Sequence, residues 1–118
     1  MGTVSPGPST PVFRCFVAEN TPDRVLLRAV GEVDLSTAPE LSREVLRHVG
    51  RGAPVLLDAA DIAFIDCAGF RVLLQALRRE PRFALVRPSE SVRRLLYLLD
   101  YDFPISDDGQ GTAPVRRA

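Results

Sequence analysis

Residues 62–70 have the sequence Ile-Ala-Phe-Ile-Asp-Cys-Ala-Gly-Phe, which is the most informative stretch of this chain. Asp66 stands just before a predicted helix, where a carboxylate can accept backbone N–H groups and meets the positive end of the helix dipole. Gly69 lets the backbone approach a ligand closely, or packs against a sheet. Taken alone, the stretch predicts an ordinary capped helix that follows a loop.

The segments on either side of this stretch predict a strand and a helix. Upstream, Ala53–Asp58 is a short continuous apolar run flanked by turn residues, which predicts a strand that is buried on both faces and ends at Asp58. Downstream, the chain predicts a helix from about Ala68 to Arg79. Its apolar positions recur at helical spacing and are Phe70, Leu73, Leu74 and Leu77.

An earlier helix begins near Thr37. Thr37 and Glu40 have the spacing of a capping box, in which the two side chains satisfy each other's backbone amides. Pro39 fits the first helical turn, which needs no intrahelical donor. Gly50 and Gly52 end this helix.

The remaining segments complete an alternating pattern of strands and helices. The runs 12–18 and 24–31 predict two strands joined by a turn at 20–23, and therefore a hairpin. Residues 82–87 predict a further strand. Ser89 is expected to cap a third helix, and residues 101–105 to add a last short strand.

The order of these elements predicts an α/β fold. We expect a mixed sheet of four to five strands, with the N-terminal hairpin followed by parallel strands, covered by about three helices. This single domain spans residues 12–106, between a disordered lead at 1–11 and a loose tail at 107–118. Functional surfaces of such sheets lie at the carboxyl ends of the strands, which places Gly31–Thr37 and Asp58–Gly69 there.

Composition excludes several functions. Fifteen basic and fifteen acidic residues give a formal net charge of zero, so nothing favours nucleic acid or an anionic membrane as partner. The chain contains no Lys, which rules out Schiff-base chemistry and Walker-type phosphate binding. Its one His, His48, and its two distant Cys predict no metal site, no cofactor and no catalytic site. We expect a cytoplasmic binding protein that is not an enzyme.

Three segments together resemble the STAS domain family, which includes the anti-sigma factor antagonists and the cytoplasmic domains of sulfate transporters. They are Gly31-Glu32-Val33-Asp34, Val55-Leu56-Leu57-Asp58 and Phe64–Phe70. The resemblance extends over roughly Phe13 to Ile105. Its most specific part is the family's Asp-Ser-Ser-Gly-Leu motif, which is present here as Asp66-Cys67-Ala68-Gly69-Phe70.

The resemblance implies regulation of transcription by docking between proteins in bacteria. Family antagonists bind an anti-sigma factor, usually a serine kinase of the histidine-kinase-like ATPase fold, and so free a sigma factor. The kinase phosphorylates the second Ser of the motif, and the added charge disrupts the interface. The expected partner-binding residues lie in two segments: Asp34, Ser36, Thr37, Asp66, Cys67, Ala68, Gly69, Phe70 and Arg71.

The motif departs from the family pattern at both serines. Ala68 occupies the phosphoacceptor position and has no hydroxyl, so we hypothesise that it mimics the permanently unphosphorylated, binding-competent form. Cys67 replaces the preceding Ser, and a thiol at a helix N-terminus favours a redox switch, alone or with Cys15. The simpler interpretation is a small, inert substitute for Ser. Segment 108–118 has too few apolar residues for the family's usual terminal helix.

Other functions remain open to different degrees. Asp58 at a strand end resembles the phosphoacceptor of receiver domains, but those also need a Lys, so we expect Asp58 to bond to loop amides instead. The main alternative is a STAS regulatory subunit of an ABC-type transporter complex. The exposed helix faces leave homodimerisation undecided.

Overall fold

A computed structural model describes residues 13–106. The segments expected to be disordered or loose, 1–11 and 107–118, lie outside the described residues, as does the expected lack of a terminal helix. The described part contains five strands and three helices. In chain order these are β1 (Arg14–Thr21), β2 (Arg24–Val33), α1 (Ala38–His48), β3 (Val55–Ile65), α2 (Cys67–Arg79), β4 (Ala84–Val86), α3 (Glu90–Leu98) and β5 (Ile105–Ser106).

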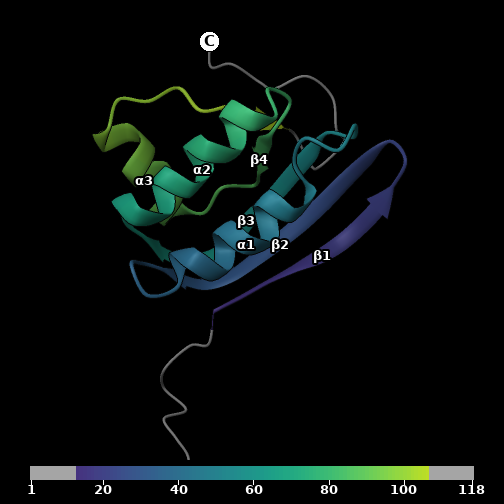
Figure 1. Cartoon of the computed structure of the whole chain (residues 1–118). Coiled ribbons are helices and arrows are strands. Elements are labelled where there is room, and N and C mark those ends of the chain that lie inside the picture. Colours follow the sequence, from purple (N-terminus) through teal and green to yellow (C-terminus); the bar gives the residue numbers. More distant parts are fainter. Residues whose placement is uncertain (1–12, 107–118) are drawn as a thin grey trace, which may run out of the picture.

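The strands form one mixed sheet in the order β1-β2-β3-β4-β5 (Figure 1). β1 and β2 pair antiparallel as the predicted hairpin, and the three later pairs are parallel. Spatial order follows chain order, because each helix carries the chain to the next place along the sheet. The predicted fold class is therefore confirmed.

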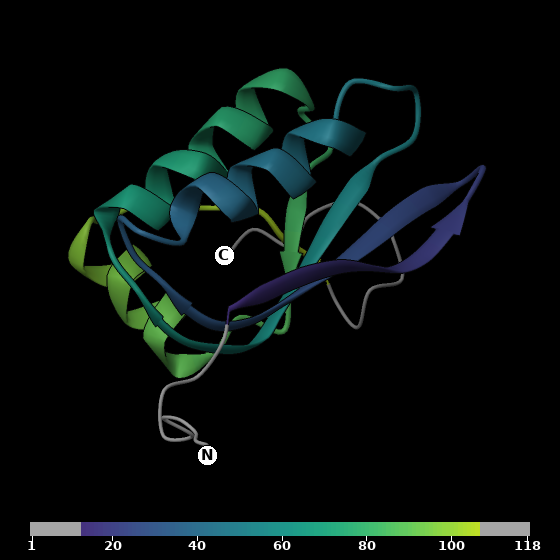
Figure 2. The same cartoon turned by 60° about the horizontal axis from the view of Figure 1, so that its bottom comes forward.

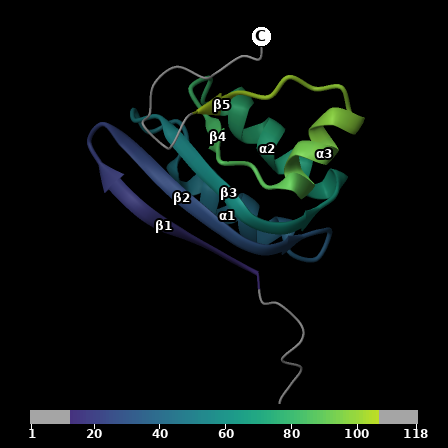
Figure 3. The same cartoon turned by 180° about the vertical axis from the view of Figure 1, so that it is seen from behind.

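The helices lie on different sides of the strands. Figures 1 and 2 show α1 and α2 side by side over one face of the sheet, whereas α3 lies near the ends of β2 and β3 on the other side. The view from behind, in Figure 3, shows the strands in front of α1 and α2. The core between the layers consists of fully buried aliphatic and aromatic side chains, among them Leu27, Leu41, Leu57, Leu73 and Phe83.

β3 is nearly twice as long as expected, so the prediction that it ends at Asp58 is wrong. It continues to Ile65 as a partner of β2, with one more residue than β2 in each of two places. The first lies between the pairs Arg28–Asp58 and Val30–Asp61. The second lies between the pairs Gly31–Ile62 and Glu32–Phe64. Such bulges bend a strand and increase its twist, and they break the simple alternation that identifies a strand in sequence.

Gly31 explains how β2 follows this bend. Its φ of 114° lies in the region that side chains rarely adopt, and it stands at the second irregularity. Beyond Asp58, β3 no longer pairs with β4, whose partners are Leu56, Leu57 and Asp58. The carboxyl half of β3 is therefore free to curve toward α3.

The last predicted strand lies later in the chain than expected. β5 comprises Ile105 and Ser106, whereas residues 101–104 form an irregular segment. Phe103 in this segment is buried and packs edge-on against Phe83, with ring centroids 6.1 Å apart. Phe103 thus fills the core instead of belonging to a strand, while Tyr101 remains exposed.

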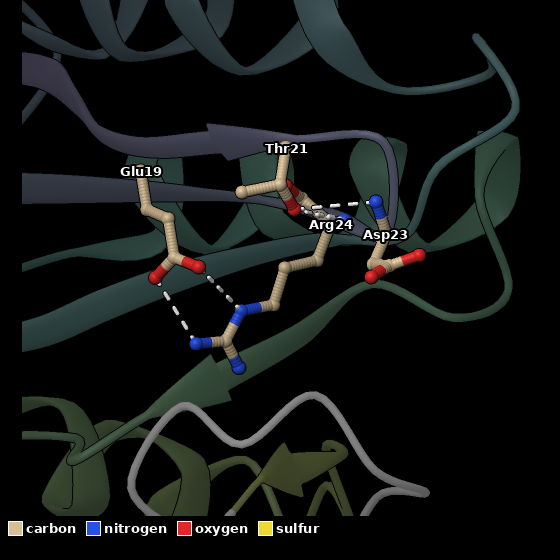
Figure 4. Close-up of polar contacts among 4 residues, drawn as sticks. All are labelled: Glu19, Thr21, Asp23 and Arg24. Atoms are coloured by element: carbon tan, nitrogen blue, oxygen red, sulfur yellow. Dashed lines mark hydrogen bonds and ion pairs between the residues drawn. The ribbon is translucent and has the colours of Figure 1, made fainter.

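The hairpin tip, drawn in Figure 4, lies at the end of the sheet opposite to the paired residues Val33 and Ile65. The Thr21 hydroxyl oxygen accepts hydrogen bonds from the backbone N–H groups of Asp23 and Arg24, each at 3.2 Å. Arg24 also forms an ion pair with Glu19 across the hairpin, with 3.0 Å between nitrogen and oxygen. These contacts close the turn locally and leave it remote from the carboxyl ends of β2 and β3.

No helix within residues 13–106 is long and apolar enough to span a membrane.

Candidate functional site: the start of α2

The start of α2 is fixed by Asp66, as the sequence predicts. The Asp66 backbone is extended, and its carboxylate oxygen Oδ1 accepts hydrogen bonds from the N–H groups of Ala68 at 2.9 Å and Gly69 at 3.3 Å. Its own N–H donates to the carbonyl of Val33 at 3.1 Å. The cap therefore ties the first turn of α2 to the ends of β2 and β3.

Gly69 is required by close packing. A Cβ added there would lie 2.6 Å from Cγ1 of Val33 and 2.8 Å from Cγ1 of Ile65, and real Cβ contacts are not this short. Both neighbouring side chains are buried in the core, where they have little room to move. Of the two roles considered for this glycine, the structure supports packing of the helix against the sheet.

The first turn of α2 presents a mixed surface. Cys67 and Arg71 are exposed, while Ala68 is half-buried against the core. Phe70 is also half-buried, and its ring meets that of Tyr101 edge-on with centroids 5.3 Å apart. The exposed side chains of this turn are therefore Cys67 and Arg71, and Ala68 and Phe70 are partly accessible.

The loop between β2 and α1 closes on the carboxylate of Asp34. This carboxylate accepts hydrogen bonds from the hydroxyl of Ser36 at 2.7 Å, from the N–H of Ser36 at 2.9 Å and from the N–H of Thr37 at 3.2 Å. The Ser36 hydroxyl is the main cause of a lowered Asp34 pKa, which the two backbone donors lower further against a partial loss of hydration. Asp34 is thus held ionised by its own loop.

The predicted capping box at Thr37 and Glu40 is wrong. The Thr37 hydroxyl makes no cap bond to α1; it donates to the carbonyl of Glu32 at 2.7 Å and accepts from the N–H of Asp34 at 2.9 Å. Thr37 has near-helical dihedral angles, φ −105° and ψ −15°, unlike the extended backbone that a capping side chain needs. Its side chain therefore fastens the loop to β2.

The two predicted segments come together at one end of the sheet. Val33 and Ile65 are paired residues at the ends of β2 and β3, and Asp34 and Asp66 follow them directly. In Figure 1 the loop after β2 and the start of α2 lie at the same edge of the molecule. The expected grouping of Asp34, Ser36 and Thr37 with residues 66–71 thus agrees with their positions.

Several apolar residues at this end are exposed, which the sequence analysis did not predict. Leu35 is 79% exposed and Phe64 is 47% exposed. On the last turn of α3, Tyr97 is 83% and Leu98 is 70% exposed. The sequence held one sign that Tyr97 and Leu98 are exposed. Residues 95–99 are Leu-Leu-Tyr-Leu-Leu, and a run of five apolar residues is too long to fit one buried face of a helix.

The two cysteines have different surroundings, and neither forms a disulfide. Burial, with smaller contributions from the nearby carboxylates of Glu44 and Glu40, raises the pKa of the Cys15 thiol to about 12. Cys15 therefore stays a protonated thiol at neutral pH, and thiols react mainly as thiolates. Cys67 is exposed at the first position of α2.

Asp58 is a structural residue inside β3. The expected bonding to loop amides is wrong, because the N–H of Ala60, which donates to Asp58 at 3.1 Å, lies within β3. Asp58 also forms ion pairs with Arg28 at 3.3 Å and Arg87 at 2.5 Å. Asp58 is only 3% exposed, and this burial alone would raise its pKa. The hydrogen bonds from Arg87 and Ala60 and the positive charges of Arg87 and Arg28 outweigh the burial, so the pKa of Asp58 is lowered. Asp58 is therefore ionised and lies outside the candidate site.

Within residues 13–106, no three His, Cys, Asp or Glu side chains gather in a way that could hold a metal ion.

Comparison with known proteins is consistent with this geometry. The family model described as the STAS domain matches residues 16–111, most of the chain. The chain belongs to the STAS domain family. A search of curated protein sequences finds no significant match.

Solved structures share the STAS fold. An anti-sigma factor antagonist from Mycobacterium paratuberculosis aligns with a TM-score of 0.68 and 20% identity, over 80% of this chain and 81% of that one. SpoIIAA, an anti-sigma factor antagonist, aligns in its unphosphorylated form with a TM-score of 0.63 and 18% identity, over 84% and 90%. The phosphorylated form of the Bacillus SpoIIAA gives 0.60 and 18%, over 84% and 93%. At these identities the likeness shows the fold alone.

Proposed function

We propose that this STAS domain is an anti-sigma factor antagonist, which binds an anti-sigma factor at the start of α2 and so frees a sigma factor. The observation that carries the proposal is the surface built around Asp66. A capped helix start offers Cys67, Ala68 and Arg71 beside the Asp34 loop, and no metal-type cluster lies within the described residues. Such a surface is suited to protein docking.

Ala68 removes the usual phosphorylation site of the motif. In the family's Asp-Ser-Ser-Gly-Leu motif a kinase adds a phosphate at this position. The phosphate brings about two negative charges, which disfavour the interface through repulsion and desolvation. Ala68 carries no oxygen to accept a phosphoryl group. The protein therefore stays in its binding-competent form regardless of kinase activity.

The partner class follows from the resemblance together with the fold. Several structural neighbours of the chain are anti-sigma factor antagonists. Their shared fold supports an anti-sigma factor as the partner here, and the resemblance of the motif points to the kinase type with a histidine-kinase-like ATPase fold. Because Ala68 cannot be phosphorylated, such a kinase would be bound without modifying this motif.

The proposal is tested by direct binding. The full chain is titrated by calorimetry with each purified anti-sigma kinase encoded in the same genome, and release of the sigma factor is followed by size-exclusion chromatography. We expect binding by at least one kinase, sigma release, and no phosphate incorporation at the motif in the presence of ATP. Binding of a transporter ATPase in place of every kinase would instead establish the transporter-regulatory role.

Two substitutions of Ala68 sharpen this test. Ala68→Glu places a negative charge at the half-buried position and should weaken binding about tenfold or more, which corresponds to about 1.4 kcal/mol. Ala68→Ser should restore phosphate incorporation by the bound kinase. Ala18→Glu is the matched control, because Ala18 is exposed on β1. Equal effects of the two Glu variants would contradict docking at α2.

A further inference from the structure

We infer that the partner bound at α2 also docks on a second, apolar surface formed by Phe64 and the last turn of α3, and that it inserts an apolar side chain between Phe64 and Leu98. This inference rests on the proposed function, whose site it extends. The term α3 surface is used below for Phe64, Arg94, Leu95, Tyr97 and Leu98.

Exposure of the α3 surface is the first observation. Tyr97 and Leu98 are among the most exposed large apolar residues of the described part, and Phe64 is half-exposed nearby. Single exposed apolar side chains are ordinary, but a group of them in contact usually marks a binding surface. Successive positions of a helix point about 100° apart. Leu98 therefore lines a hollow together with Phe64, whereas Tyr97 lies on the adjoining face of the same turn, beside Tyr101 and Phe103.

A pocket joins Phe64 to α3. It has a volume of about 190 Å³ and is lined by Phe64, Ile65, Ser91, Arg94, Leu95 and Leu98. A cavity of about 150 Å³ can hold a benzene ring. This pocket therefore has the size to receive one apolar side chain from a protein partner, and four of its six lining residues are apolar.

The α3 surface is continuous with the site at α2. Phe64 stands two residues before the cap residue Asp66 on the same strand. Tyr101, just beyond α3, meets the Phe70 ring of α2. Figure 1 shows the end of α3, the start of α2 and the loop after β2 along one edge of the molecule.

Interface size identifies the occupant. A stable protein interface buries roughly 800 Å² on each partner, which is far more than the exposed atoms of one helix turn can supply. A partner centred on Cys67 and Ala68 must therefore extend onto neighbouring elements. The neighbouring elements are the Asp34 loop, which carries the exposed Leu35, and the apolar α3 surface, and we infer that the same partner covers both.

The α3 surface is also held in place before binding. The Ser89 hydroxyl donates to the carbonyl of Ile62, and the Ser91 hydroxyl donates to that of Ala63, each at 2.7 Å. Ser89 also caps α3 by accepting the N–H of Val92 at 3.3 Å. Because α3 is fixed to β3, docking requires little ordering of this helix, which favours affinity.

The test measures affinity for the anti-sigma kinase that binds the wild-type chain. Leu98→Gln keeps a helix-forming residue of similar length but removes the apolar contact, and should raise the dissociation constant about tenfold. Phe64→Ala, which opens the pocket, should act in the same direction. Val17→Gln is the matched control: Val17 is 37% exposed on β1 and should leave the affinity within about twofold. Thermal unfolding of each variant confirms that it is folded.

The outcomes separate the inference from the proposed function. Unchanged affinity of folded Leu98→Gln, alongside weakened Ala68→Glu, would overturn the α3 surface and leave the antagonist role intact. Absence of any kinase binding to the wild type would overturn both. Sedimentation of the free chain gives a further check, since a dimer that Leu98→Gln dissociates would assign this surface to a second copy and contradict the inference.

Discussion

Two helices begin at the same end of the sheet, and they are fixed in different ways. At α1, an aspartate, a serine and a threonine bond mainly to one another and to β2, and none of them caps the helix by its side chain. At α2, Asp66 caps the helix directly, and Gly69 brings its first turn against Val33 and Ile65. The α1 start is held mainly by the polar bonds of its own loop, with Ala38 buried behind it, whereas the α2 start is held by direct packing of its first turn on the ends of β2 and β3.

This difference indicates which of the two helix starts tolerates mutation. A loop whose polar groups bond to one another can vary with little effect on the packed layers. A helix start in contact with the core cannot move without disturbing it. We therefore expect mutations at α2 to affect both stability and docking, and mutations at α1 to have smaller, local effects.

The largest expected effect is that of Gly69→Ala. The new methyl group would overlap Val33 and Ile65, and overpacking of this kind costs about 2 kcal/mol. Chemical denaturation measures the loss in the free energy of unfolding. Gly52→Ala serves as the control, because nothing lies within 4 Å of its added Cβ and only its φ of 106° opposes a side chain. An unchanged free energy of unfolding in Gly69→Ala would refute close packing as the reason for this glycine.

A smaller loss is expected for Asp66→Ala. The variant leaves the N–H groups of Ala68 and Gly69 without their cap, and loss of an N-cap side chain costs about 1 kcal/mol. Urea denaturation of this variant and of Asp66→Asn, which keeps a capping oxygen, provides the comparison. Equal stability of the alanine variant and the wild type would show that packing alone places α2.

The α1 loop should respond to acid. Because the folded-state pKa of Asp34 is lowered, its contribution to stability is present above its unfolded pKa and is lost as the pH falls through the folded value. We expect Asp34→Asn to reduce the pH dependence of stability below about pH 4. Asp58, also with a lowered pKa, contributes a similar acid-sensitive part, so the two single variants and the double variant are measured together. An unaltered pH profile in Asp34→Asn would contradict the closed loop.

The smallest effect concerns the thiols beside the two helices. Iodoacetamide at pH 7.5 should label exposed Cys67 and leave Cys15, near Glu40 and Glu44 of α1, unlabelled until the protein unfolds. Mass spectrometry of the native and denatured protein gives the two patterns. Because the folded-state pKa of Cys15 is raised, the protonated thiol contributes to stability fully below about pH 9, and this contribution is lost as the pH rises toward 12. Native labelling of Cys15 would show that the packing between α1 and β1 opens.

A separate binding experiment tests the redox hypothesis for Cys67. If oxidation of this exposed thiol regulates docking, peroxide should lower the affinity for the kinase, and Cys67→Ser should abolish that sensitivity. Unchanged affinity after peroxide treatment would leave Cys67 as a small substitute for Ser.

Sequence patterns predicted the elements that local rules govern. The Asp66 and Ser89 caps, the α2 helix and the hairpin are set by side chains a few residues apart, and each is confirmed. The capping box at Thr37 was wrong because the Thr37 hydroxyl bonds to the Glu32 carbonyl, and that competing acceptor is created by the turn of the chain.

Features that depend on distant segments could not be predicted. The length of β3 depends on its pairing with β2 through two bulges, which hide the alternating pattern. The exposure of Phe64 and Leu98 depends on where α3 lies relative to β3. In sequence these two residues are indistinguishable from core residues, and the composition of the 95–99 run was the one local sign.

The bulges of β3 divide that strand into two parts with different structural roles. Its first half pairs with both β2 and β4, while its second half pairs with β2 alone, holds α3 through the Ser89 and Ser91 hydroxyls and leads into Asp66. Residues 61–71 and 89–98 are thus joined by these bonds, and we predict that they can be exchanged together where the end of β2 is kept. Related chains could diverge in partner choice by altering these two segments while their sheets stay the same, and a chimera that receives both segments should acquire the donor's partner.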